Sequence, residues 1–383
     1  MQAATDANGY LGAVTLIARR GAVVDWRAYG FRDLARTDPM TKDAIFRIYS
    51  MTKPIATAAA MILVEEGRLA LDEPIAKQLP EFRAMQVFDG GSADAPKLRP
   101  AASPITLRHL LTHTAGFATG GAGFEEPTKL LEQADLHGSA DLADFSRRVA
   151  RLPLAIDPAR RFAYDGTGIE VVSRLVEAAS GMPFDAFVQR RVLAPLGMKD
   201  TGFTVPDYRR KRIVDITAMG PEGRLVLDDG RTATRPGEMM QNYASGAGGL
   251  YSTASDYLRF CEMLLEGGKL RGPRGDTIIL HPKTVETMMR DQLPDGVSPA
   301  GQLNGGEGFG FGGSVVIDPS RRDRAGSPGA YGWSGAASTY FTIDPKQGLI
   351  AILMMQHVHR ANMQDLPKLS ARFYDLVYKA LDR

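Results

Sequence analysis

A serine and a lysine three residues apart are the most informative pair in this chain of 383 residues. Ser50 and Lys53 follow an apolar run and precede a helical pattern, and no other serine has a lysine at the third position after it. A helix brings such positions onto one face. A serine hydroxyl is a weak nucleophile until a base takes its proton, and a lysine beside it can be that base. The pair predicts a serine hydrolase site that needs no histidine; the alternative is a solvated helix end.

The helix that would position this pair has its own signals. Pro54 falls in the first turn, where proline is tolerated because the first N–H groups of a helix have no helical partner. Apolar residues then recur at helical spacing until Gly67, which predicts a helix over 55–66. Its N-terminus would direct free N–H groups and a partial positive charge at Ser50.

Tyr164 is the candidate for a second proton carrier. The ordinary pKa values of phenols and amines are both about 10, so a neighbouring pair can share a proton. Tyr164 lies in a turn-rich segment that leads into a predicted helix over 168–180. The alternative for this residue is a packed aromatic ring without a catalytic role.

The third piece of a site would be the segment Gly332-Trp-Ser-Gly335, which comes just before a predicted strand from Ser338. Glycine and small residues let an extended backbone approach a substrate closely. The N–H of Ala336, together with that of Ser50, would then form an oxyanion hole. The alternative is a simple loop that enters the strand.

Other motifs are weaker. A Gly-x-Gly-x-x-Gly run at 308–313 precedes a strand and not a helix, which disfavours dinucleotide binding, and no Gly-x-Ser-x-Gly elbow of an α/β-hydrolase is present. His357 and His359 share one face of a predicted strand, but no third ligand is evident near them. We therefore expect no metal site and no cofactor.

Composition limits the partners and the compartment. The formal net charge of +2 gives no field that would recruit nucleic acid. No apolar run approaches the roughly 18 residues of a membrane span. The single cysteine, Cys261, excludes an intrachain disulfide. We expect a cytoplasmic protein, or a periplasmic or secreted one if a signal peptide has been removed.

The order of elements predicts an α/β (α+β) fold. Strands cluster at the two chain ends and helices in the middle, so both ends should form one antiparallel sheet flanked by helices. We expect residues 1–75 and 245–383 to form this sheet domain and 76–244 a mostly helical lobe, with a pocket between them. The further expected helices span 107–112, 141–151, 183–194, 255–266, 282–290 and 366–381, and the expected long loops are 84–104, 290–308 and 318–330.

Several motifs in one order resemble the serine β-lactamase superfamily. They are Ser50-Met-Thr-Lys53, Leu110-Leu-Thr-His-Thr-Ala-Gly116, Tyr164-Asp-Gly166, Pro195-Leu-Gly-Met198 and Trp333-Ser-Gly335. The resemblance implies a β-lactamase/transpeptidase-like fold and is strongest to the family VIII carboxylesterases. It implies Ser50 as the acylated nucleophile, Lys53 with Tyr164 as the base system, and the backbone of Ser50 and Ala336 as oxyanion donors. The segment around His113 looks structural.

Two departures from the superfamily pattern concern the substrate. Gly166 stands where penicillin-recognising relatives usually carry asparagine, and Trp333 stands where they carry a lysine that faces the substrate carboxylate. An indole in place of this cation removes a partner for an anion and offers an apolar wall. We therefore expect Trp333 and Gly335 beside Ala336 to favour neutral acyl esters.

These observations predict a serine carboxylesterase that hydrolyses short to medium-chain acyl esters through an acyl-enzyme on Ser50. Its expected partner is a small-molecule ester. The same residues would serve a β-lactamase, a D-amino peptidase, an amidase or an acyltransferase. A non-catalytic penicillin-binding-like module is the remaining alternative.

Overall fold

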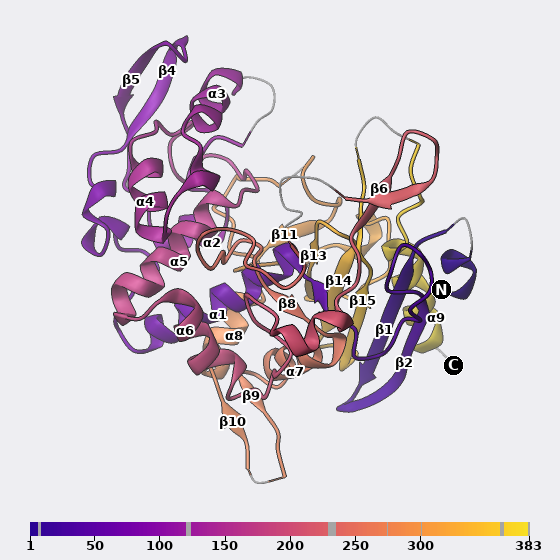
Figure 1. Ribbon diagram of the computed structural model, residues 1–383. Coiled ribbons are helices and arrows are strands. Elements are labelled where there is room, and N and C mark those ends of the chain that lie inside the picture. The colour runs from indigo at the N-terminus through magenta and orange to yellow at the C-terminus, as the bar shows by residue number, and fades with distance from the viewer. Residues whose placement is uncertain are drawn as a thin grey trace.

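The computed structural model describes residues 1–6, 9–119, 124–228, 235–273, 275–299, 301–360 and 364–381. Figure 1 places a sheet built from both chain ends on one side and the helices from the middle of the chain on the other. This arrangement confirms the expected α/β (α+β) fold with an antiparallel sheet.

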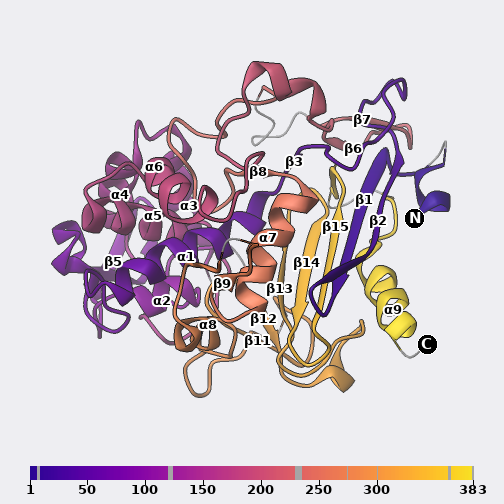
Figure 2. The same cartoon turned by 90° about the horizontal axis from the view of Figure 1, so that it is seen from below.

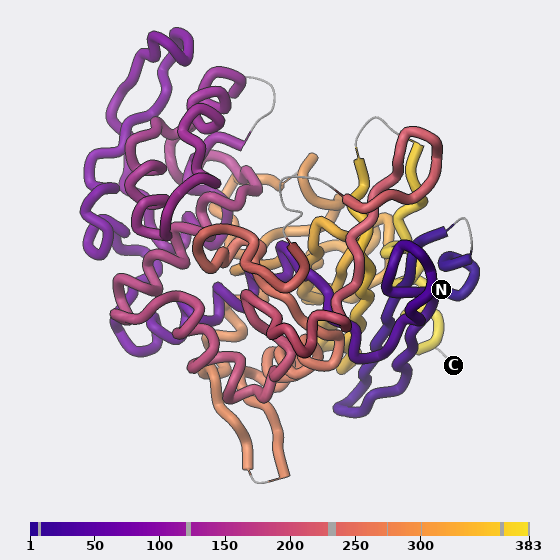
Figure 3. Tube along the Cα trace, in the orientation of Figure 1, coloured from indigo at the N-terminus to yellow at the C-terminus, as the bar shows by residue number. Residues whose placement is uncertain are grey.

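The main sheet has seven strands in the order β11-β12-β13-β14-β15-β1-β2, and every neighbouring pair is antiparallel. Figure 3 shows the N-terminal hairpin beside the C-terminal strands. The strands are β1 (Gly12–Arg19), β2 (Ala22–Gly30), β11 (Glu307–Phe309), β12 (Ser314–Val316), β13 (Tyr331–Gly335), β14 (Thr339–Asp344) and β15 (Leu349–Met354).

All six residues of strand β15 are apolar, and all are buried, as expected for a strand that is covered on both faces. Alternate side chains of a strand point to opposite faces. Ile350 and Ile352 join the large core with α7 (Ala254–Leu265), whereas Leu349 and Leu353 join a smaller core with α9 (Ser370–Leu381). Figure 2 shows these two helices on either side of the sheet.

Helix α1 (Thr52–Glu65) is buried along nearly its whole length and packs against α5 (Thr167–Ser180). The remaining α-helices are α2 (Leu107–Leu111), α3 (Glu125–Gln133), α4 (Leu142–Ala150), α6 (Phe184–Val188) and α8 (Pro282–Met288). The small sheets pair β3 (Phe46–Arg47) with β8 (Tyr251–Ser252), β9 (Lys269–Leu270) with β10 (Thr277–Ile278), and β6 (Thr217–Met219) with both β7 (Leu225–Leu227) and β16 (His357–Val358).

The expected loop over 84–104 is wrong, because this segment forms the hairpin of β4 (Gln86–Ser92) and β5 (Ala95–Pro100). Most of its residues are exposed, so it lacks the apolar alternation of a buried strand. Backbone hydrogen bonds with Leu154, far along the chain, anchor β4. This tertiary contact has no local sequence signal.

Other differences are smaller. Helix α9 begins at Ser370 and not near 366, and the expected helix over 183–194 continues from α6 into a π-turn at Gln189–Leu193. Helix α3 was not predicted. The proposed domain boundaries at 75/76 and 244/245 stay a prediction. No helix in the described part of the chain is long and apolar enough to cross a membrane.

Candidate active site

Ser50 lies in a single 3-10 turn, Tyr49–Met51, that leads directly into α1. The helix itself begins two residues after Ser50, at Thr52. Tyr49 has a φ of +42°, in the left-handed region that a bulky residue rarely adopts. Such backbone strain persists only where the surrounding structure enforces it, and it is common beside functional groups.

Lys53 is 3% exposed and points back toward Ser50 from the first turn of α1. Its Nζ donates to Ser50 Oγ at 3.2 Å and to the carbonyl of Ala247 at 2.7 Å. The Nζ also lies 5.0 Å from the ring centre of Tyr164. The structure therefore brings together the hydroxyl, the amine and the phenol ring that the sequence singles out.

The hydroxyl of Tyr164 faces an indole. Trp333 Nε1 donates to Tyr164 Oη at 3.0 Å, and the two ring centres are 5.0 Å apart. Among the hydrogen bonds of the described residues, none joins this phenol directly to Ser50 or Lys53. The backbone N–H of Tyr164 donates to Gln302 Oε1 at 2.8 Å, which holds the loop before α5. The direct polar contact of the Trp333 side chain is therefore with the hydroxyl of Tyr164.

His113 supports Tyr164 from another side. Its ring centre is 4.6 Å from that of Tyr164, and its side chain is fully buried. Burial lowers the pKa of His113, which favours the neutral ring. Its Nδ1 accepts from the N–H of Asp165 at 3.3 Å. These contacts fit a packing role, in agreement with the structural reading of this segment.

Glu170 is a cavity residue that the sequence analysis missed. It is buried on α5, and it accepts hydrogen bonds from the hydroxyl of Ser245 and, at 3.1 Å, from the N–H of Gly246. These bonds hold the segment whose next residue, Ala247, accepts from Lys53. Burial raises the pKa of Glu170 to about 7. The sequence did carry a signal for a functional or structural role of Glu170, since this acidic residue interrupts the apolar run from Ile169 to Val172.

The end of β13 brings Ala336 to the same cavity. Gly335 lies so close to the chain ahead of Ser50 that an added Cβ would be 2.3 Å from the carbonyl oxygen of Ile48. The N–H of Ser338 donates to the Gly335 carbonyl at 3.1 Å and closes a turn around Ala336. The segment Gly332–Gly335 is therefore strand, and not the loop that was the alternative.

The cavity that contains these groups has a volume of about 780 Å³. Among its described lining residues, Lys53 is the one lysine or arginine. Glu132 and Asp135 contribute exposed carboxylates to the same lining. Trp333 and Gly335 are not among the lining residues. The lining residues with large apolar or aromatic side chains are Tyr49, Leu131, Leu136, Phe145, Tyr164, Met240 and Tyr243.

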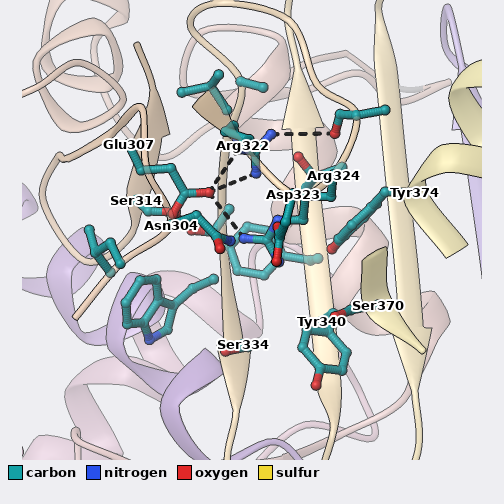
Figure 4. Close-up of a pocket in the computed structure, with 18 of the residues that line it drawn as sticks. Asn304, Glu307, Ser314, Arg322, Asp323, Arg324, Ser334, Tyr340, Ser370 and Tyr374 are labelled. Carbon is teal, nitrogen blue, oxygen red and sulfur yellow. Dashed lines mark hydrogen bonds and ion pairs between the residues drawn. The ribbon is translucent and has the colours of Figure 1, made fainter. Parts of the chain in front are cut away.

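A separate cavity of about 440 Å³ lies beside Trp333 and Ser334, and Ser50 does not line it. Figure 4 shows the charged cluster within it. Arg322 and Arg324 both donate to one carboxylate oxygen of Glu307, at 2.7 and 3.1 Å. These ion pairs tie β11 to the segment before β13, and no hydrogen bond between the described lining residues pairs a serine hydroxyl with a basic side chain.

Both the sequence and the fold of this chain are similar to those of known proteins. The sequence matches the protein family described as Beta-lactamase over residues 1–373. Protein Rv1367c of Mycobacterium tuberculosis is 34% identical over 359 residues, which cover 92% of this chain and 87% of that protein. Esterase EstB of Burkholderia gladioli is 31% identical over 364 residues, covering 90% and 85%.

Among solved structures, one described as "EstCE1, a hydrolase with promiscuous acyltransferase activity" superposes with a TM-score of 0.79 at 27% identity, covering 99% of this chain and 96% of that one. The match to the family spans nearly the whole chain, and the paired serine and lysine lie in one cavity. The chain therefore belongs to the beta-lactamase family, within its serine hydrolases and acyltransferases.

Proposed function

We propose that this protein is a carboxylesterase that hydrolyses neutral esters with short to medium acyl chains through an acyl-enzyme on Ser50. The observation that carries the proposal is the contact of Lys53 Nζ with Ser50 Oγ at 3.2 Å inside the large cavity. A buried amine on the hydroxyl is the arrangement that activates a serine without histidine.

In the proposed reaction, Ser50 Oγ attacks the ester carbonyl carbon while its single proton is taken up by the base system that Lys53 and Tyr164 form together. The N–H groups of Ser50 and Ala336 would stabilise the oxyanion. As the intermediate collapses, the bond to the alkoxy group breaks and the alcohol leaves with the proton. Water then attacks the acyl-enzyme, with the same groups used in reverse.

Charge supports a neutral substrate. Penicillins and peptide C-termini carry a carboxylate, and Lys53, the one lysine or arginine among the described lining residues, is already engaged by Ser50 and Ala247. Glu132 and Asp135 at the same cavity would repel an anion. The apolar lining side chains offer contacts to an acyl chain in their place.

Acyl transfer is a second candidate, in which an alcohol takes the place of water. The similarity to EstCE1, described as a hydrolase with promiscuous acyltransferase activity, favours it. The cavity volume of about 780 Å³ also falls in the usual range for sites that hold drug-sized ligands, so an acyl group and an alcohol could be held together.

The test measures initial rates with p-nitrophenyl butyrate and nitrocefin for the native protein, Ser50→Ala and the control Ser139→Ala. Ser139 is buried, and its hydroxyl has no hydrogen-bond partner among the described residues. We expect butyrate hydrolysis to fall at least about 10³-fold in Ser50→Ala and to persist in the control.

Each other outcome identifies a rival. Turnover of nitrocefin without turnover of the butyrate ester would establish a β-lactamase. Butyl butyrate as the main product in the presence of butanol would establish an acyltransferase. If a fluorophosphonate fails to label Ser50 and neither substrate reacts, the protein is a non-catalytic module.

A further inference from the structure

A cluster of metal-ligating side chains lies outside the lining of the Ser50 cavity. His357 Nε2 is 2.8 Å from Asp365 Oδ1, and His359 Nδ1 is 3.5 Å from Asp365 Oδ2. The three donor atoms all lie within 4.8 Å of one another. The expectation that the two histidines have no third ligand is therefore wrong. Asp365 lies beyond the strand that carries His357, so strand periodicity could not reveal it.

The hydrogen bonds of His357 determine which ring nitrogen carries the proton. The hydroxyl of Thr217 donates its hydrogen to the carbonyl of Gln356 at 3.0 Å. Its oxygen, 3.1 Å from His357 Nδ1, must then accept a hydrogen from that nitrogen. Nε2 is therefore the nitrogen that faces Asp365 Oδ1, at 2.8 Å, and the one that a metal ion would take.

His359 repeats this pattern with a different hydroxyl. Tyr10 Oη donates its hydrogen to the carbonyl of Pro367 at 2.9 Å. His359 Nε2, at 3.3 Å from the same oxygen, is thus the donor, and Nδ1 is the nitrogen that faces Asp365 Oδ2 at 3.5 Å. Each histidine thus uses one ring nitrogen for a neighbouring hydroxyl oxygen and directs the other at the same carboxylate.

Both ligand types have the outer contacts that metal sites use. A metal-bound histidine usually donates its other N–H to a neighbouring oxygen, as both rings do here, and a ligating carboxylate is itself hydrogen-bonded. Asp365 accepts from the N–H groups of Leu366 at 2.7 Å and Arg360 at 3.2 Å. These bonds would orient the carboxylate before a cation arrives.

We propose that His357, His359 and Asp365 bind one divalent transition-metal ion, with zinc as the best match. Neighbouring ligands of tetrahedral zinc are about 3.3 Å apart for bonds of about 2.0–2.1 Å. The separations of 2.8 and 3.5 Å lie on either side of this value, so small side-chain shifts admit the ion. The His357 side chain is 1% exposed and that of His359 is 19% exposed, so solvent reaches the cluster beside His359.

The cluster is joined to the turn that carries Ala336. The N–H of His357 donates to the Ala337 carbonyl at 3.1 Å, and Ser338 Oγ donates to the His357 carbonyl at 2.8 Å. A metal bound here would brace the turn between β13 and β14 from behind. Its role is structural, since the ion would take no part in the reaction at Ser50.

The experiment uses the full chain without a histidine tag, treated with chelator and returned to metal-free buffer. Zinc binding is measured by titration calorimetry, and bound cobalt by its visible absorption. We expect one zinc per chain with a Kd of micromolar or tighter, and a melting temperature that rises with free zinc because the ion binds the folded state.

Two ligand variants and one control make the result specific. His359→Gln and Asp365→Asn should each weaken zinc binding at least about 100-fold while circular dichroism stays native. His281→Asn, at the exposed start of α8, should leave affinity unchanged. Absence of saturable binding, or equal affinity in all four proteins, would overturn the proposal and leave only a hydrogen-bonded cluster. Esterase activity is not a readout, so the proposed function can fail independently.

Discussion

The side chain of Tyr164 is held in place by the groups around it. Its ring lies against those of His113 and Trp333, and its oxygen accepts the indole N–H. Because Trp333 occupies one side of this oxygen, the phenol's own hydrogen must be directed to the other side. Trp333, which the motif pattern links to substrate preference, is therefore placed to orient the proposed proton carrier Tyr164.

This role predicts the effect of Trp333→Phe. Phenylalanine keeps the aromatic packing but loses the N–H that donates to Tyr164. We expect kcat for p-nitrophenyl butyrate to fall about tenfold, the equivalent of roughly 1 to 1.5 kcal/mol for one hydrogen bond, with little change in KM.

The matched control is Trp26→Phe. Trp26 lies in β2, and its Nε1 has no hydrogen-bond partner among the described residues. It should keep full activity. Equal losses in both variants, or a loss confined to KM, would show that the indole N–H does not orient the catalytic group.

At the scale of elements, the short strand β13 makes two contacts at the site, one through a side chain and one through its backbone. Trp333 reaches Tyr164, while Gly335 lets the backbone lie against Ile48, two residues before Ser50. This contact determines how closely Ala336 approaches Ser50. No side chain can replace Gly335 without moving either the strand or the turn that carries Ser50.

Gly335→Ala should therefore separate the strand from the turn that carries Ser50. Its Cβ would be 2.3 Å from both the Ile48 carbonyl oxygen and Thr339 Oγ1, so the backbone must shift. We expect a loss of about 1–3 kcal/mol in the free energy of unfolding and about 100-fold in kcat, since small misplacements of reacting groups are costly.

Urea unfolding and steady-state kinetics measure the two effects. Gly202→Ala is the control, because its Cβ would meet its nearest neighbour, the Thr204 carbonyl oxygen, at an ordinary 3.4 Å. If Gly335→Ala retains native kcat, the approach of β13 to the Ser50 turn is not what positions the proposed oxyanion donors.

At the scale of the whole molecule, the site depends on segments from distant parts of the chain. Glu170 on α5, in the helical half, binds Ser245 and Gly246 on the segment that returns to the sheet. This segment offers Ala247 to Lys53. One buried carboxyl thus links the helical part of the structure to the segment that holds Lys53.

Glu170 should make global stability depend on pH. Burial raises its pKa from 4.5 to about 7, so the folded protein binds this proton more tightly than the unfolded chain does. The contribution to stability is complete below pH 4.5 and is lost as pH rises toward about 7, by about 3 kcal/mol at most.

Urea unfolding at several pH values compares the native protein with Glu170→Gln. The stability of the native protein relative to the variant should decrease as pH rises through this window. Glu126→Gln should give the opposite slope, because Lys129 lowers the pKa of Glu126 and that carboxyl stabilises the fold when ionised. A flat difference for Glu170→Gln would mean that its carboxyl titrates alike in both states.

The sequence by itself determined the features that depend on local patterns. Ser50 and Lys53 meet because their spacing matches one turn at the start of a helix, and β15 is recognised by its continuous apolar run. The helices from α4 to α8 follow from their periodicity and from residues that end them. Motif order placed the chain within its superfamily without any coordinates.

Only the tertiary structure decided which groups from separate segments face each other. The hydrogen bond from Trp333 to Tyr164, the anchoring of Ala247 through Glu170 and the meeting of Asp365 with two histidines each join residues that lie far apart or beyond a turn. The β4–β5 hairpin also depends on a distant segment, since backbone hydrogen bonds join β4 to Leu154. Local spacing carries no record of such contacts, because they arise from packing of the complete chain.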